Sequence, residues 1–263
     1  MNISIIGAGN MGSAVARGIL TNTSEHTVYI SNPSKGKLDA LQQEFPQIRI
    51  TTNNKDAVKD ADLIILAVKP WLIPTVLLEI GSAVADKHPI LASLAGGVSL
   101  EDIEDALPMA GVDIPMLCRV MPNTAIAKGS SMTFIATAHS TPEKVKALVT
   151  LFSTMGRVMC IPEHLMPAAT SLASCGIAFA LRYVRAAMEG GVELGFRPED
   201  AQRIICQTLQ GTVDLLSQPG AHPEAEIDKV TTPGGLTICG LNAMEGCGFT
   251  HSVQQGLRAS IKK

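Results

Sequence analysis

The residues best suited to bind a small anion form a glycine-rich stretch near the end of the chain. Thr231 or Thr232 can serve as a helix N-cap there, and Pro233 suits the first helical position. Gly234 and Gly235 follow, although each glycine costs a helix roughly 1 kcal/mol relative to alanine. The first turn of a helix carries unpaired N–H groups and a partial positive charge, so it can hold a carboxylate or a phosphate. The glycines either open these amides to a ligand or form a cap packed closely against another helix.

Thr237 adds a hydroxyl one turn further along this predicted helix. A hydroxyl beside an anion site can orient a substrate and relay a proton, although threonine is a poor acid by itself. We therefore interpret Gly234, Gly235 and Thr237 as candidate substrate-binding residues. A reaction at this site needs a second reactant, and the beginning of the chain indicates which one.

The beginning of the chain carries a dinucleotide-binding fingerprint. A β-branched run over 2–6 leads into Gly7-Ala8-Gly9-Asn10-Met11-Gly12, and an Ala-rich helical pattern follows over 13–20. This motif requires a strand immediately before it and a helix immediately after it, and both are predicted here. The first glycine makes the tight turn, the second lets the backbone approach the pyrophosphate, and the third allows close helix–strand packing. These elements predict a nucleotide site.

The end of the second predicted strand, 27–30, bears on the choice of cofactor. A site specific for NAD usually carries Asp or Glu there, whereas Ser31 is followed here by Asn, Pro and Ser. With the lysines at 35 and 37, these donors suit a 2′-phosphate, which favours NADPH and leaves NADH as a second cofactor. The alternative is that they only cap the helix predicted over 34–44.

Small residues follow two further apolar runs, 63–68 and 90–94. In open α/β sheets ligands lie at the carboxyl ends of the strands. We therefore place beside the cofactor the residues at these two ends, which are Ala67, Val68, Lys69, Pro70 and Ala95. An ordinary surface lysine is the alternative reading of Lys69.

The pattern divides the chain into two regions. Residues 1–158 alternate between strands and helices, with strands predicted over 2–6, 27–30, 48–51, 63–68, 90–94, 118–121 and 130–137, the last at the sheet edge. Residues 159–263 show only helical patterns. We predict an α/β protein with an N-terminal Rossmann-like doubly wound sheet and an all-α C-terminal dimerisation domain. A dense helical region with few aromatics often completes its core with a second chain, so we expect a homodimer.

Composition excludes several classes. Of the 263 residues, 46% are hydrophobic and 17% charged, which is typical of a core-rich globular protein. The net charge of -3 shows no basic excess, so we expect no nucleic-acid partner. No secretory signal opens the chain, and the uncharged span between His164 and Arg182 is too polar for a membrane crossing, so we expect a buried helix and a cytoplasmic protein. The six cysteines lack metal-ligand spacing, and we expect reduced thiols and no metal.

Four segments, in this order and spacing, identify a family. They are Gly7-Ala-Gly-Asn-Met-Gly12, Ala67-Val-Lys-Pro70, Arg119-Val-Met-Pro-Asn-Thr124, and Asp228-Lys-Val-Thr-Thr-Pro-Gly-Gly-Leu-Thr237 running on to Glu245 and Gly248-Phe249. On these segments the chain resembles the pyrroline-5-carboxylate reductases over essentially its whole length. The resemblance implies a Rossmann domain, a helical domain interleaved with that of a second subunit, and often a ring of five dimers, a decamer. It also implies reduction of 1-pyrroline-5-carboxylate to proline with NADPH, or less efficiently NADH.

The resemblance also implies roles for particular residues. It assigns the pyrophosphate to the loop Ile6–Met11, the adenosine-side phosphate to Ser31, and a further cofactor contact to Asn54. It assigns the nicotinamide side to Ala67–Pro70, Ala95 and Asn123. The substrate site then comprises Glu163, Thr232, Gly234, Gly235, Leu236 and Thr237, with the Thr237 hydroxyl near the ring nitrogen as the candidate catalytic group.

The chain departs from the family pattern at three places. Ala173-Ser-Cys-Gly-Ile-Ala178 replaces a usual Ser-Gly-Ser-Gly-Pro-Ala on the long helix, Ala125 replaces a proline, and Pro33 stands where an arginine is common. Two other functions remain as alternatives: a β-hydroxyacid dehydrogenase or imine reductase of similar architecture, and a non-catalytic NADPH-binding protein. The first would carry a catalytic lysine in the helical half, and no lysine occurs between residues 160 and 228.

Overall fold

A computed structural model describes residues 1–84, 87–107 and 116–261. The chain divides into two compact units, Met1–Ser174 and Cys175–Lys263. The predicted domain boundary at 158/159 remains a prediction.

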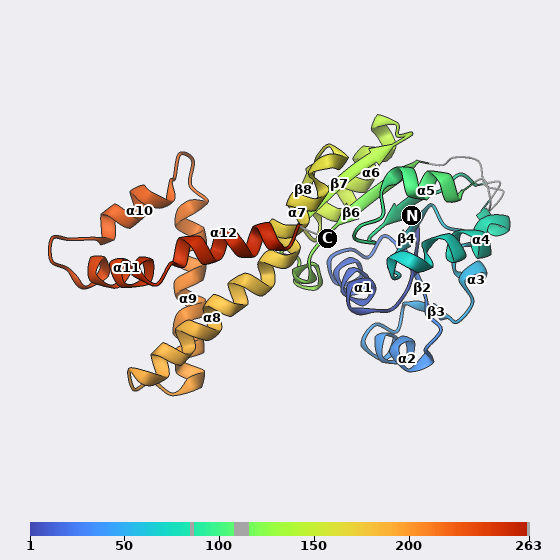
Figure 1. The fold of residues 1–263 in the computed structure, drawn as a ribbon. Coiled ribbons are helices and arrows are strands. Elements are labelled where there is room, and N and C mark those ends of the chain that lie inside the picture. Colours follow the sequence, from blue (N-terminus) through green and yellow to red (C-terminus); the bar gives the residue numbers. More distant parts are fainter. Residues whose placement is uncertain (85–86, 108–115, 262–263) are drawn as a thin grey trace. The chain divides into compact units, whose positions relative to one another are not determined.

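The first unit is built on one sheet of eight strands in the order β3-β2-β1-β4-β5-β6-β7-β8 (Figure 1). Strands β1 to β6 pair with one another in parallel. β7 runs antiparallel to β6, and β8 is parallel to β7. The order 3-2-1-4-5-6 is the dinucleotide-binding order, with its switch point between β1 and β4. The strands are β1 (Asn2–Ile6), β2 (Thr27–Ser31), β3 (Arg49–Thr51), β4 (Leu63–Leu66), β5 (Ile90–Ser93), β6 (Leu117–Met121), β7 (Ser131–Ala138) and β8 (Gly156–Cys160).

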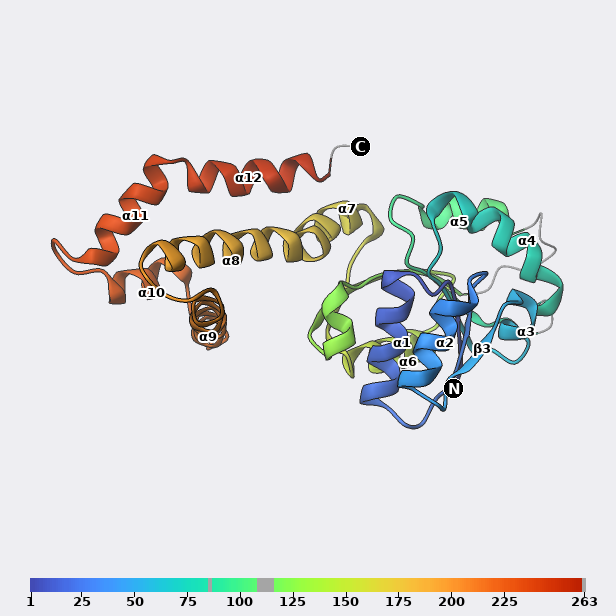
Figure 2. The ribbon, with the colours of Figure 1, turned by 90° about the horizontal axis from the view of Figure 1, so that it is seen from below.

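Helices cover both faces of this sheet, which confirms the predicted fold class (Figures 1 and 2). They are α1 (Asn10–Asn22), α2 (Lys35–Glu44), α3 (Asn54–Val58), α4 (Ile73–Val84), α5 (Leu100–Ala106), α6 (Pro142–Ser153) and α7 (Met166–Ala169). Alternate strand residues point to opposite faces. Accordingly Leu63 and Ile65 pack in one core with α1, α2 and α6, whereas Ile64 and Leu66 pack in the other with α3, α4 and α5.

The sheet edge differs from the prediction. The run 130–137 was expected at the edge, but β7 lies between β6 and β8. Sequence patterning missed β8 because its five residues alternate only weakly, and Arg157, Met159 and Cys160 are exposed at the edge of the sheet. This segment becomes a strand because it pairs with β7, and no local sequence pattern predicts that pairing.

The second unit contains only helices, as predicted. After a π-helical turn over Thr170–Cys175 come α8 (Gly176–Glu193), α9 (Pro198–Leu216), α10 (Pro223–Val230), α11 (Leu236–Gly246) and α12 (Phe249–Ala259). Within this unit α8 packs against α9 and α12, and α10 packs against α9 (Figure 1). Among its described residues only Ala201 is buried, while apolar side chains such as Leu181 and Val213 are 61% and 57% exposed.

The expectation of a buried helix around His164–Arg182 is wrong for the single chain. The helical segment Glu163–Glu193 is long and apolar enough to cross a membrane by length and composition alone, and only 17% of its most apolar window is buried. Sequence patterning detects an apolar helix but not the chain that covers it. Apolar surface of this extent needs another molecule to exclude water from it.

Candidate active site

The glycine loop lies between β1 and α1, where β1, β4 and α1 converge. Gly7 adopts a φ of +106°, and its N–H donates to the Ser31 carbonyl at 2.8 Å. A Cβ at Gly7 would lie 2.5 Å from the Ala67 carbonyl oxygen, and a Cβ at Gly12 would lie 1.9 Å from the Gly7 carbonyl oxygen. Both positions therefore exclude any side chain.

Gly9 has a different environment, because no atom lies within 4 Å of the Cβ it would carry. It is the N-cap of α1 and offers no side chain to the first turn. The first N–H groups of a helix have no intrahelical partner, so those of α1 are available to an anion. The absence of a side chain at Gly9 leaves the approach to them open.

A cavity of about 600 Å³ opens in front of this loop. It is lined at the carboxyl ends of β1, β2 and β4 by Ile6, Gly7, Gly9, Asn10, Met11, Ser31, Asn54, Ala67, Val68 and Lys69, all of which the sequence predicted as cofactor residues. Five other predicted cofactor residues do not line it, namely Ala8, Gly12, Pro70, Ala95 and Asn123. The size and the wall of small residues suit an extended dinucleotide.

Two of those five residues are buried and form hydrogen bonds within the protein. Ala8 is buried, and its N–H donates to Asn32 Oδ1 at 3.1 Å, which ties the loop to the end of β2. Asn123 is 5% exposed and caps the 3₁₀ helix Thr124–Lys128 by accepting from Ala125 N at 3.0 Å. Its Nδ2 donates to the Ala173 carbonyl at 3.3 Å, so its side chain is engaged within the protein.

Sequence reasoning left several lining residues out of the predicted site. They are Asn32, Pro33, Lys37, Leu72, Thr75, Val76, Glu79 and Leu94. Asn32 and Lys37 follow β2 and were predicted only as donors that suit a 2′-phosphate, and Pro33 only as a departure from the family pattern. Thr75, Val76 and Glu79 belong to α4, and a helical pattern by itself does not say which side faces a ligand.

Ser31, Asn54 and Glu79 form a hydrogen-bonded chain at the cavity wall. Ser31 is fully buried, and its Oγ donates to Asn54 Oδ1 at 2.7 Å. Asn54 Nδ2 in turn donates to Glu79 Oε2 at 2.7 Å. The Ser31 hydroxyl is thus engaged by Asn54, which is only half-buried, and the contact of Ser31 with the cofactor remains a prediction.

A partly buried ion pair joins Arg119, in the middle of β6, to Glu163. Arg119 is 8% exposed, and its Nη1 lies 2.9 Å from Glu163 Oε1. The same oxygen accepts the N–H of Leu100, the first residue of α5, at 2.7 Å. Arg119 Nε is buried without a hydrogen-bond partner among the described residues. Glu163, predicted as a substrate residue, is thus held at a fixed place by two donors.

The Gly234–Gly235 segment differs from the predicted helix start. Pro233 and Gly234 form a turn, and α11 begins at Leu236 with Gly235 as its N-cap. Gly234 adopts a φ of +69°, and a Cβ at Gly235 would lie 2.4 Å from Thr232 Oγ1. The turn and this close approach are a local reason for the two glycines, in addition to any ligand.

The later helix start still leaves amides available. The first N–H groups of α11 belong to Leu236, Thr237 and Ile238, and Gly235 supplies no side-chain cap. Leu236 is 93% exposed and Thr237 is also exposed. These residues belong to the second unit, whereas the cavity belongs to the first.

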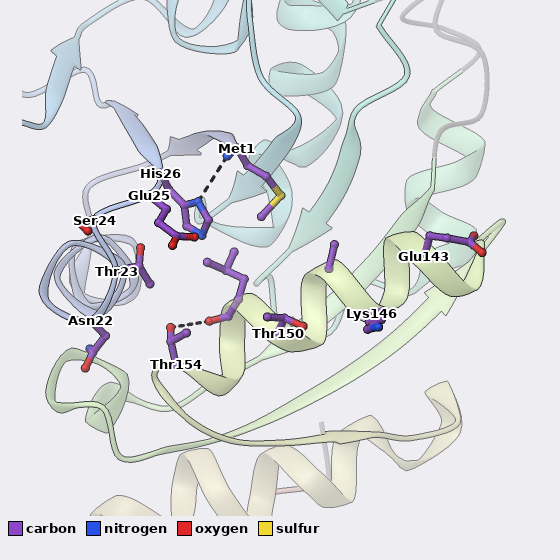
Figure 3. Close-up of a pocket in the computed structure, with 12 residues that line it drawn as sticks. Met1, Asn22, Thr23, Ser24, Glu25, His26, Glu143, Lys146, Thr150 and Thr154 are labelled. Atoms are coloured by element: carbon purple, nitrogen blue, oxygen red, sulfur yellow. Dashed lines mark hydrogen bonds between the residues drawn. The ribbon is translucent and has the colours of Figure 1, made fainter.

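A second cavity, of about 690 Å³, lies at the opposite ends of the strands (Figure 3). Its walls come from Asn22–His26 after α1, from Met1, and from α6 with Glu143, Lys146 and Thr150. The last turn of α1 presents carbonyl groups there, which disfavour a phosphate. The second cavity also lacks a glycine loop. Of these two cavities, the one in front of the Gly7–Gly12 loop therefore fits a dinucleotide.

The fold and the first cavity together define a class of protein. A parallel sheet of dinucleotide-binding order, a glycine loop at its switch point and a cavity at the carboxyl ends of the strands are the features of an NAD(P)-dependent oxidoreductase. The comparisons with known proteins narrow this class.

Residues 163–263 match the family described as pyrroline-5-carboxylate reductase dimerisation, and residues 2–97 match NADP oxidoreductase, coenzyme F420-dependent. The chain is 35% identical to pyrroline-5-carboxylate reductase 2 of Dictyostelium discoideum, over 100% of this chain and 91% of the relative. It is 36% identical to pyrroline-5-carboxylate reductase 1 of the same organism, over 99% of this chain, and spans about half (49%) of that longer relative. The chain belongs to the pyrroline-5-carboxylate reductase family.

Solved structures agree on the fold. The pyrroline carboxylate reductase of Plasmodium falciparum, solved with NADP bound, superposes with a TM-score of 0.89 over 100% of this chain and 96% of that one, at 24% identity. The helical region of our protein is accordingly a dimerisation domain, which accounts for its exposed apolar helices.

Substitutions of two loop glycines should separate folding from cofactor binding. We expect Gly12→Ala to lower the free energy of unfolding by about 1–3 kcal/mol, because its Cβ collides with backbone. Gly9→Ala should leave the melting temperature unchanged but weaken NADPH binding about tenfold or more, because its methyl group enters open space at the anion site. Differential scanning calorimetry and titration calorimetry measure the two effects. Equal destabilisation by both variants would contradict this division.

Proposed function

We propose that the protein reduces 1-pyrroline-5-carboxylate to L-proline with NADPH, the last step of proline biosynthesis. The family membership and the glycine-lined cavity of the first unit support this proposal. The cavity residues fit the cofactor on structural grounds, because Gly9 faces open space and the first turn of α1 has free amides. When bound, the reduced nicotinamide supplies the hydride that the imine carbon accepts.

The protein's main task in this reaction is positioning. An imine carbon needs little activation, so the residues must hold it close to the cofactor and exclude water. Ala67, Val68 and Leu94 provide an apolar wall on the side away from the phosphates. Lys69 lines the same cavity and adds a positive charge to it.

The substrate site is proposed at the start of α11. The amides of Leu236 and Thr237 bind the carboxylate, and the dipole of α11 favours its negative charge. The Thr237 hydroxyl orients the ring nitrogen and relays a proton to it. Thr232, Gly234 and Gly235 shape the turn that presents these amides. Glu163 is a further proposed substrate residue.

We propose NADPH as the preferred cofactor. Lys37 lines the cavity beyond the end of β2, where no acidic residue stands, so positive charge is available to a 2′-phosphate. NADH, which lacks this phosphate, should bind more weakly to the same loop.

Replacing Thr237 tests the proposed substrate role. We expect Thr237→Ala to lower kcat about a hundredfold, because it removes the hydroxyl that relays the proton, while the Kd for NADPH stays unchanged. Thr237→Ser keeps a hydroxyl and serves as the matched control. Steady-state kinetics and calorimetric titration with NADPH give both numbers, and unchanged turnover in the alanine variant overturns the assignment.

An absorbance assay tests the reaction itself. NADPH oxidation should follow the addition of racemic 1-pyrroline-5-carboxylate and proceed faster than NADH oxidation. A 2-hydroxy acid offered with the oxidised cofactor should give no reaction, because the helical half lacks the lysine of the dehydrogenases with similar architecture. Lack of oxidation with either reduced cofactor contradicts the proposed function.

We further propose a cytoplasmic homodimer formed through the helical domain, and from it a decamer, with no membrane involved. The exposed apolar residues of α8 and α9 support self-association. Sedimentation equilibrium should give the mass of two chains or a multiple of two. A stable monomer at micromolar concentration would contradict the dimer.

A further inference from the structure

We infer that Glu79 sets the ratio of NADPH to NADH binding by supplying, from α4, the carboxylate that is absent from the end of β2. This inference rests on the proposed assignment of the first-unit cavity to the dinucleotide. In dinucleotide sites an acidic residue after the second strand accepts the ribose hydroxyls and disfavours a 2′-phosphate. Here Glu79 lines the same cavity as Ser31 and Asn54, although it lies far from them in the sequence.

The hydrogen bonds fix the direction in which each group faces. A carboxylate only accepts, so the bond of 2.7 Å to Glu79 Oε2 requires the amide nitrogen of Asn54 on that side. The reversed amide would place Asn54 Oδ1 against the carboxylate. Asn54 therefore presents its oxygen to Ser31, whose only hydroxyl proton is used in that 2.7 Å bond.

At this wall the Ser31 hydroxyl has no free proton and Glu79 keeps a free acceptor oxygen, so the second hydrogen on Asn54 Nδ2 is the remaining side-chain donor of the three. Ser31 is fully buried with its proton committed to Asn54 and has none to give to a phosphate. Glu79 is half-buried, and Oε2 is the oxygen bonded to Asn54, which leaves Oε1 with no partner among the described residues. A ribose hydroxyl can donate to this oxygen, whereas a 2′-phosphate meets like charge.

Lys37 acts in the opposite direction. It is exposed, follows β2 and lines the same cavity, so it attracts a 2′-phosphate. The protein thus combines one cation that favours the phosphate with one carboxylate that favours the hydroxyl. The balance between them makes Glu79 a specificity-determining residue.

Binding of the adenosine half alone tests the inference in the full-length protein. The probes are adenosine 2′,5′-bisphosphate and ADP, whose affinities are measured by titration calorimetry. In Glu79→Gln we expect the affinity ratio to move about tenfold toward the bisphosphate, because one like charge and one charged acceptor are removed. The change in bisphosphate affinity should become smaller at high salt if it is due to charge, because salt screens charge interactions. A change caused by altered cavity shape would not depend on salt.

Two variants control for charge elsewhere and for side-chain length. Asp39→Asn removes the same charge from an exposed position on α2 that does not line the cavity, and its ratio should equal that of the wild type. Glu79→Asp keeps the carboxylate and should stay close to the wild-type ratio. The inference is overturned if the ratio in Glu79→Gln is unchanged, or if Glu79→Asp or Asp39→Asn moves it as far.

The outcome is separable from the proposed reaction, because no pyrroline takes part in these titrations. If the wild type binds neither probe, both the inference and the dinucleotide assignment fail. If the probes bind as expected but the reductase assay fails, only the substrate assignment is lost.

Discussion

The first unit depends on the close approach of three backbone segments at one point. The turn after β1, the first turn of α1 and the residue after β4 lie so near one another that Gly7 and Gly12 have no room for a Cβ. This contact brings the start of α1 to the carboxyl ends of β1 and β4, at the switch point of the sheet. The cavity and its free helix amides follow from that contact. A methyl group there would separate the helix from the sheet and move the amides away from the phosphate position.

Charged groups in the first unit are placed by partners from distant elements. Glu163 is held by Arg119 of β6 and by the first amide of α5, and Glu79 is held by Asn54 of α3. α5 itself is capped by Ser99 and Asp102, and the hydrogen bonds from Ser99 lower the pKa of the Asp102 carboxyl. Fixed carboxylates of this kind act on a ligand through both charge and direction, since their donors leave particular oxygens free. Of these carboxylates, Glu79 is the one that lines the cavity.

The second unit, unlike the first, has almost no buried core in a single chain. Its long helices are amphipathic, yet Ala201 is the one buried residue among those described. Such a domain gains its stability from the surface that a second copy covers, so its folding is coupled to association and to concentration. The π-helical turn over Thr170–Cys175 overlaps the start of Ala173–Ala178, the segment in which the chain departs from the family pattern. π-Turns of this kind are often kept at functional sites in helices.

The sequence by itself determined the local elements. The seven predicted strands, the glycine loop and the helical half all appear, because each depends on short-range patterns such as β-branched runs, glycine spacing and apolar helical periodicity. Ten of the residues predicted around the cofactor line one cavity for the same reason, since the carboxyl ends of neighbouring parallel strands meet at one edge. The motif near Thr237 was also recognisable from residue types, although the helix starts at Leu236 because Gly234 turns the chain first.

Tertiary structure decided what depends on pairing between distant residues. β8 became a strand only by pairing with β7, and Glu79 reached the cavity only because α4 packs against α3. Ser31 was identifiable as a residue at the end of a strand, but its complete burial and its bond to Asn54 were not. A sequence pattern records which residues are apolar or polar within a few turns. It does not record which distant group will satisfy a hydrogen bond or cover an apolar face, and those contacts fixed the charges around the cavity.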